Sequence, residues 1–276
     1  MTTTLTRATP PVARRIAALL PATGPTPWRA TAHRTTYTDS PAALISDGTR
    51  EVVAAFHDSH VTLAWARRGE GATYPIVAVP SSNPTRIARE IMRSALPDLD
   101  TLHAPNRTAS DFLDDLRGQF AARGVKTNAW SAHGTGTSMR TWRRGRTLLS
   151  LETARLHRPT LNLQYGDDGS GTLADFETLL PLFLPTEPRH PYKPLGDDIT
   201  GGIPRRLYAR FSHAPMRQLT PYGALSFGNR VGPTGVIETP DYRARARDHS
   251  PVRALITGIG LDFLTTIVDQ LADSNA

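Results

Sequence analysis

A short apolar strand, a turn and an amphipathic helix follow one another three times along the chain. Each strand candidate is a short apolar run, and each helix candidate places apolar side chains three and four residues apart. Glycine or proline occupies the turn between them in every copy. The three copies cover residues 74–96, 160–184 and 252–271. This order predicts small sheets that are each covered by helices.

Other segments complete the same pattern. Helix candidates precede the three copies at residues 12–20, 111–123 and 203–213, and Ser110 and Gly124 suit the two ends of the second of these helices. Strand candidates lie at residues 51–56, 61–66 and 147–153. We therefore predict an α+β fold in which repeated small antiparallel sheets are flanked by helices, as α-β(3-4)-α units.

Proline marks the expected boundaries between these units. Prolines gather at residues 97–105 and again at residues 185–194, where they favour a semi-rigid connection. The predicted units are residues 1–100, 101–187 and 188–276, the third being degenerate in its pattern. Two alternatives remain open, a chain of two units and a single continuous α+β domain.

Several classes of chemistry are excluded by composition. The chain contains no cysteine, which rules out disulfides, thiolate metal sites and cysteine nucleophiles. The glycine-rich phosphate loop, the HExxH zinc motif and the GxSxG hydrolase motif are also missing. We expect no cofactor and no metal. The apolar runs are shorter than a membrane span or a secretory leader needs, so the chain is predicted to be cytoplasmic and without a membrane partner.

The cationic residues are almost all arginine. Lys126 and Lys193 are the only lysines among 32 cationic residues, and the formal net charge is +7. Residues 116–151 contain no acid but carry seven positive charges, with Trp130 and Trp142 among them. A second acid-free run covers residues 199–237. Arginine binds phosphate with two hydrogen bonds and stacks on bases, so these runs favour contact with a polyanion.

We interpret the chain as a noncatalytic binding module whose expected partner is nucleic acid, with DNA as the first choice. Arginines would contact phosphates, and an exposed indole would stack on an unpaired base. The candidate residues are Arg140, Trp142, Arg143, Arg144, Arg146, Arg206 and Arg210.

Two other functions stay open. The repeated units suit a scaffold that binds other proteins. An enzyme is the third possibility, because His57-Asp58-Ser59-His60 places two imidazoles beside a carboxylate and a hydroxyl. Aspartate and serine also favour tight turns between strands, and we expect this tetrapeptide to be such a turn.

One short motif resembles a known family. Thr239-Pro240-Asp241-Tyr242, followed by Arg243 and Arg245, is similar to the signature of the tandem SPDY-motif domains, an actinobacterial family of unknown function. Ser46-Asp47-Gly48 with Arg50 is a weaker form of the same motif. The resemblance implies domains in tandem and carries no active site.

Overall fold

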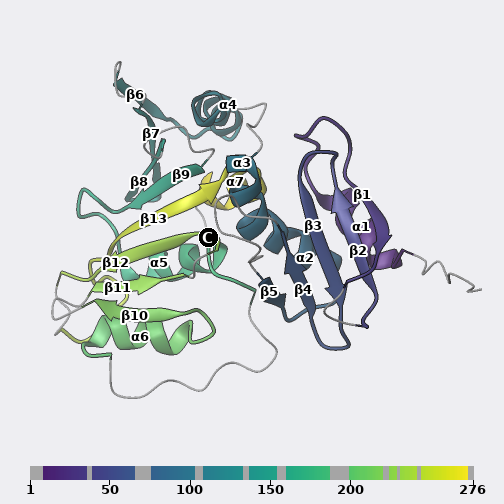
Figure 1. Cartoon of the computed structure of the whole chain (residues 1–276). Helices are drawn as coiled ribbons and strands as arrows, with labels where there is room; N and C mark the ends of the chain where they lie inside the picture. Colours follow the sequence, from purple (N-terminus) through teal and green to yellow (C-terminus); the bar gives the residue numbers. More distant parts are fainter. Residues whose placement is uncertain are drawn as a thin grey trace, which may run out of the picture. The chain divides into compact units, whose positions relative to one another are not determined.

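The computed structural model divides into two compact units, unit 1 from Met1–Asn106 and unit 2 from Arg107–Ala276 (Figure 1). It describes residues 9–35, 39–65, 76–102, 108–132, 137–153, 160–186, 199–219, 224–228, 231–240 and 244–272. Both units combine helices with an antiparallel sheet, which confirms the predicted α+β class.

Unit 1 is a five-stranded meander with helices before and after it. The strands pair in the order β1-β2-β3-β4-β5, and every pair is antiparallel. Helices α1 and α2 contact one another, α1 also contacts β1 and β2, and α2 also contacts β5. The elements are α1 (Pro11–Leu19), β1 (Arg29–His33), β2 (Ala42–Ser46), β3 (Glu51–Phe56), β4 (Val61–Ala64), β5 (Ile76–Val79), α2 (Pro84–Glu90), a π-helical turn (Ile91–Ala95) and α3 (Leu96–Leu102).

Alternation of side chains explains the packing of unit 1. Along β2 and β3, Ile45, Val52 and Ala54 are fully buried, and Ala13 and Ile16 of α1 are fully buried as well. A strand places successive side chains on opposite faces, so one face of the sheet supplies the core. The predicted turn between β3 and β4 is confirmed, because the His57 N–H donates to the His60 carbonyl at 2.9 Å.

Unit 2 is built around an eight-stranded antiparallel sheet in the part of the chain that is described. Its strands follow the order β10-β11-β12-β13-β9-β8-β7-β6 (Figure 1). The elements are α4 (Ala109–Ala121), β6 (Asn128–Ala132), β7 (Thr137–Arg144), β8 (Thr147–Thr153), β9 (Thr160–Tyr165), α5 (Leu173–Leu179), a 3-10 turn (Leu180–Leu182), α6 (Gly202–Arg210), β10 (Met216–Leu219), β11 (Ala224–Phe227), β12 (Thr234–Glu238), β13 (Arg253–Gly260) and α7 (Leu261–Ala272).

The two halves of unit 2 have the same order of elements. Each runs helix, four strands in a meander, helix, and the halves meet where β9 pairs antiparallel with β13. β9 and β13 are the last strands of their halves, so the strands of each half follow in reverse chain order on either side of this pair. The predicted units 101–187 and 188–276 thus share one sheet, and the division of the chain into three domains stays a prediction.

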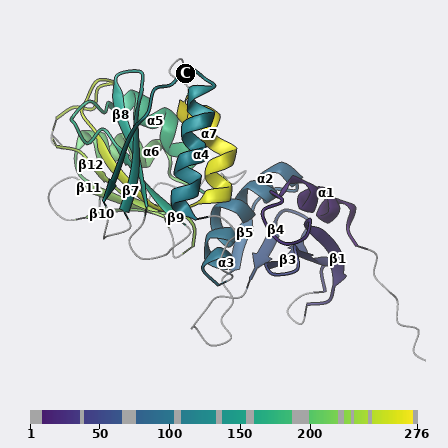
Figure 2. The same cartoon turned by 90° about the horizontal axis from the view of Figure 1, so that it is seen from above.

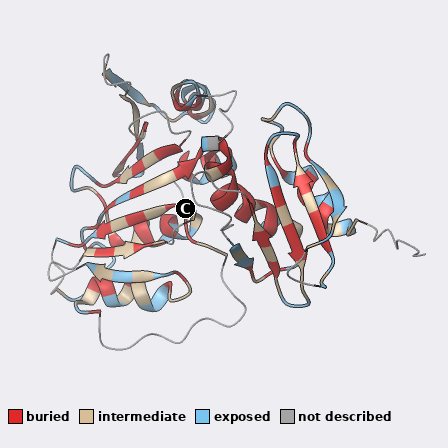
Figure 3. Ribbon diagram, viewed as in Figure 1, coloured by how far each residue is buried: buried red, intermediate tan, exposed pale blue. Residues whose placement is uncertain are grey.

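One face of this sheet, called here the inward face, packs against helices. Helix α4 contacts β7 and β8, and α7 contacts β13. Tyr165 of β9 lies 5.0 Å from Phe176 of α5, measured between ring centroids. Helices α4 and α7 also contact one another and lie side by side (Figure 2). Buried residues gather along the strands and the neighbouring helices (Figure 3).

Two local predictions are wrong. Gly258 and Gly260 do not form a turn before the last helix, because β13 continues to Gly260 through an irregularity in its pairing with β9 between Ile256 and Ile259. Gly258 has a φ of 73° and lets the strand bend there. The cap of α4 is Thr108 rather than Ser110, since Thr108 accepts a hydrogen bond from the Asp111 N–H and Asp111 reaches back to the Thr108 N–H.

No helix among the described residues is long and apolar enough to cross a membrane.

Candidate nucleic-acid interface

Strand β7 distributes the predicted site residues over two faces. Arg140, Trp142 and Arg144 alternate with Thr141 and Arg143. A strand has a side-chain period of two, so the first three side chains share the inward face and the other two share the opposite, outward face. The sequence predicted Arg140, Trp142, Arg143 and Arg144 to lie together at one nucleic-acid interface. Parity along the strand divides them into two sets with different surroundings.

Trp142 belongs to the core. Its side chain is 2% exposed. Its indole N–H donates to the Leu271 carbonyl at 3.0 Å, and its ring meets Phe120 edge-on with 4.9 Å between centroids. The predicted exposure of Trp142 is wrong, because a large aromatic on the inward face fills the space between β7 and helices α4 and α7. A base cannot stack on its ring while unit 2 is folded.

Arg140 and Arg144 are tied to helix residues. Arg140 donates to the Leu113 carbonyl at 3.2 Å and forms an ion pair with Asp114. Arg144 is 5% exposed and pairs with Asp175, with further hydrogen bonds to the Gln270 carbonyl and the Thr178 hydroxyl. The predicted exposure of Arg144 is therefore wrong as well. Both arginines hold helices onto the inward face of the sheet.

Arg206 and Arg210 also serve an internal contact. Both lie on α6 and bind the buried carboxylate of Glu177 on α5, at 2.7 Å and 2.6 Å. Arg206 pairs with Asp248 too, at 2.9 Å. Hydrogen bonds from the guanidinium to Glu177 and then to Asp248 raise the pKa of Arg206. These two arginines connect α5 to α6, away from β7.

The cationic groups near the β7–β8 turn and just before β6 have fewer ion-pair partners. Arg143 is exposed, and its guanidinium contacts Asp168 at 3.0 Å and the Arg146 carbonyl at 2.5 Å. Arg146 and Lys126 are exposed, and neither side chain has an ion-pair partner among the described residues. Of the predicted residues, Arg143 and Arg146 therefore remain available to a ligand.

Trp130 is the exposed indole of this strand pair, with 54% of its surface accessible. β6 pairs with β7 so that Trp130 lies opposite Met139 and Asn128 lies opposite Thr141. Opposite residues share a face, which places Trp130 on the same outward face as Thr141 and Arg143. We call Lys126, Trp130, Arg143 and Arg146 the β6–β7 patch. Trp130 and Lys126 lie in the acid-free run, but only the register of β6 against β7 separates Trp130 from Trp142.

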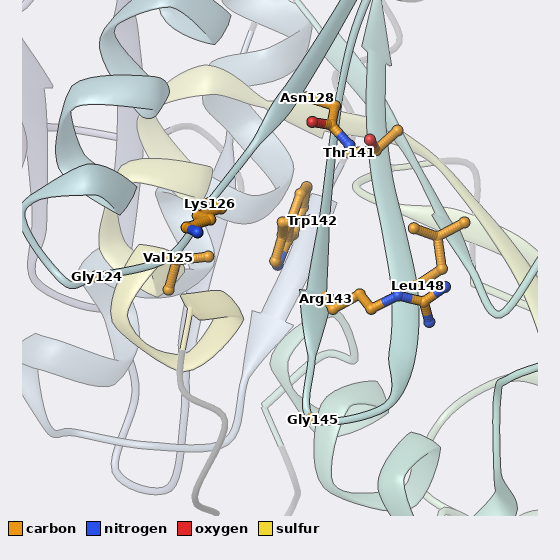
Figure 4. A pocket seen from close by; sticks show the side chains of 9 residues that line it. All are labelled: Gly124, Val125, Lys126, Asn128, Thr141, Trp142, Arg143, Gly145 and Leu148. Atoms are coloured by element: carbon orange, nitrogen blue, oxygen red, sulfur yellow. The ribbon is translucent and has the colours of Figure 1, made fainter.

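A pocket of about 520 Å³ opens beside the patch (Figure 4). The pairing of β6 with β7 begins at Asn128, opposite Thr141, and the preceding segment stands apart from β7. The ring of Trp142 lies in the gap between that segment and β7 (Figure 4). The lining residues are Gly124, Val125, Lys126, Asn128, Thr141, Trp142, Arg143, Gly145 and Leu148.

The two other motifs singled out in the sequence have structural roles. The His57 and His60 rings stack with 4.4 Å between centroids, and the Ser40 hydroxyl lies 2.9 Å from Nδ1 of His57. Among the described residues no group of three or more His, Asp or Glu side chains could hold a metal. The histidines thus close the turn between β3 and β4.

Asp47 and Arg50 form a buried clamp in unit 1. Asp47 accepts hydrogen bonds from the Arg50 N–H and guanidinium, each at 2.8 Å, and Arg50 also pairs with Asp100 at 2.8 Å. Burial alone raises the pKa of Asp47, but the donors on Arg50 and Thr49 outweigh it and hold that pKa below its ordinary value. The clamp fixes the β2–β3 turn.

Comparison of the chain with protein-family models, curated proteins and solved structures finds no match. The resemblance to SPDY-motif domains stays a prediction. Of the residues that carry it, Asp241, Tyr242 and Arg243 lie outside the described part of the chain.

Proposed function

We propose that unit 2 binds nucleic acid through the β6–β7 patch. The observation that carries the proposal is an exposed indole on β6 that shares the outward face of the β6–β7 pair with Arg143, while Lys126 lines one pocket with Arg143 and Arg146 lies in the next turn. Most other candidate arginines are neutralised by carboxylates inside unit 2. The patch combines accessible cationic groups with an accessible aromatic ring farther along the same strand pair.

Each part of the patch has a distinct chemical task. The three cations attract phosphates, and Arg143 and Arg146 offer planar donors that suit phosphate oxygens. Trp130 offers a flat face to a base, and base stacking on an aromatic is worth about 1–3 kcal/mol. No part of this arrangement depends on base identity, so the proposed binding is independent of sequence. Asp168 contacts Arg143 and would compete with a phosphate for its guanidinium.

Charge-matched variants test the proposal. The first carries Lys126→Gln, Arg143→Gln and Arg146→Gln. The control carries Arg117→Gln, Arg245→Gln and Arg247→Gln, three exposed arginines outside the patch, and it loses the same net charge. Each protein is titrated by fluorescence anisotropy with labelled single-stranded and duplex DNA at several salt concentrations.

The patch variant is expected to lose most of its affinity at low salt. Its log–log salt slope for single strands should flatten by about two units, since each neutralised phosphate contributes about 0.7. The control should keep a slope close to that of the wild type. Equal losses in the two variants would show attraction by net charge alone, and no binding by the wild type would refute the proposal.

The edge of β6 favours a second candidate function, the binding of a protein partner. β6 is an edge strand of the sheet and carries no charged residue, and four of its five side chains are exposed. Such an edge can add a strand from another chain. Ala129→Pro would remove a backbone donor from this edge, so loss of self-association or peptide binding in that variant, measured by sedimentation, would support this second function.

A further inference from the structure

The backbone of Arg143 faces the pocket. The β7–β8 hairpin closes through Gly145 and Arg146, with Arg144 opposite Thr147. In a two-residue hairpin the flanking pair is hydrogen-bonded, and bonding then alternates along the strand. The N–H and C=O groups of Arg143 and Thr141 therefore point toward β6. The first residue of β6, Asn128, pairs with Thr141, and no residue of β6 lies opposite Arg143. The backbone N–H and C=O of Arg143 therefore border the pocket without a strand partner among the described residues.

The walls of the pocket combine three kinds of chemistry. Lys126 and the cationic Arg143 stand on its two sides, and Asn128 and Thr141 lie together at one end (Figure 4). Neither the Asn128 amide nor the Thr141 hydroxyl has a hydrogen-bond partner among the described residues. Val125 and Leu148 supply apolar surface. Gly124 and Gly145 add no side chain, and a Cβ atom at either would meet nothing within 4 Å.

A nucleotide matches this set of groups. Its phosphate is an anion for Lys126 and Arg143, and its base has a flat apolar face with donors and acceptors at the edge. A side-chain amide such as that of Asn128 can form paired hydrogen bonds with a base edge. The volume of about 520 Å³ lies within the ~300–1,000 Å³ of ligand pockets.

We infer that the pocket receives one unpaired nucleotide, so that the nucleic acid bound at the patch is single-stranded. The inference rests on the proposed function and specifies its partner. Asn128 and Trp130 are two residues apart on one face of β6, about 7 Å along the strand. One base in the pocket and a neighbouring base on Trp130 would follow that edge of the sheet. In a duplex the Watson–Crick edges are paired and the faces are stacked, so a duplex has no free base to place in the pocket or on Trp130.

Two variants change the pocket and keep the cationic side chains, so they measure the contribution of the pocket to binding. Val125→Phe places a larger apolar side chain in the pocket and retains all four residues of the β6–β7 patch. Asn128→Ala combined with Thr141→Val removes the polar end without filling the space. Both variants are checked by urea unfolding. Each is titrated with a 12-nucleotide single strand, the matching duplex, dAMP and inorganic phosphate.

The wild type is expected to bind the single strand at least tenfold more tightly than the duplex. Val125→Phe should reduce this ratio to about two or less while duplex binding stays unchanged, and the double variant should reduce it by at least threefold. Binding of dAMP more tightly than phosphate, lost in Val125→Phe, would also support the inference. Equal affinity of the wild type for both polymers, or a ratio unchanged in both variants, would overturn the inference and leave the proposed function intact. Absence of any binding would refute both.

Discussion

Arg143 and Arg144 are neighbours in the sequence and belong to two different regions of unit 2. Arg144 lies on the inward face of β7, where its guanidinium pairs with Asp175 and it is 5% exposed. Arg143 lies on the outward face, is exposed, and lines a pocket with Lys126 on its other side. The same side chain holds helices onto the sheet in one region and is accessible to solvent in the other. The face of the sheet on which an arginine lies, and not its charge, accounts for this difference.

Replacing each tryptophan of the β6–β7 pair should give the largest difference in the free energy of unfolding between the two faces. Trp142→Ala should destabilise unit 2 by about 3–5 kcal/mol, since it empties a fully buried ring site and removes the hydrogen bond to Leu271. Trp130→Ala should change the free energy of unfolding by about 0.5 kcal/mol or less. Urea unfolding measures both. Similar losses in the two variants would contradict the division of the hairpin into a core face and a binding face.

Replacing Arg143 or Arg144 compares the two faces again, this time through the loss of an ion pair. Arg144→Met should lower the free energy of unfolding by about 2–3 kcal/mol. This is somewhat less than the loss on breaking a fully buried ion pair, because 25% of the Asp175 side chain is exposed. Arg143→Met should cost less than about 0.5 kcal/mol, as is usual for exposed ion pairs. The measurement is again urea unfolding. If Arg143→Met were the more damaging variant, the two faces would have been assigned in reverse.

Replacing Asp168, the ion-pair partner of Arg143, should give the smallest effect, a change in DNA affinity. Asp168→Asn should strengthen DNA binding roughly two- to threefold, because an exposed pair holds Arg143 by about 0.2–1 kcal/mol. Hydrogen bonds from the Ser170 side chain, with Arg143 nearby, keep the pKa of Asp168 below its ordinary 3.8. The carboxylate therefore stays charged above that value and protonates only as the pH falls below it. Lowering the pH from 8 to 5 should not reproduce the gain through Asp168. A wild type that gains as much on acidification as Asp168→Asn gains at pH 8 would refute this account.

Local runs of apolar residues predict several strands of the fold, while the candidate site depends on how β6 pairs with β7. β3 and β8 begin and end where apolar runs at residues 51–56 and 147–153 predicted them. β6 has no such run, and its pairing with β7 comes from contacts that the sequence pattern does not display. The register of that pair places Trp130 outward and Trp142 inward. The sequence pattern therefore selected Trp142, which is buried, in place of Trp130, which is exposed.

Tryptophan fluorescence during titration with single-stranded DNA tests the central claim most directly. The chain has four tryptophans, and Trp28, Trp65 and Trp142 are all buried while Trp130 is 54% exposed. A base stacked on Trp130 should give most of the quenching, and a base in the pocket could add a smaller change from Trp142, which lines it. We predict saturable quenching in the wild type that loses most of its amplitude in Trp130→Phe, while anisotropy still detects binding with only a small loss of affinity. Quenching of undiminished amplitude in Trp130→Phe, or binding without any quenching in the wild type, would contradict the stacking of a base on Trp130.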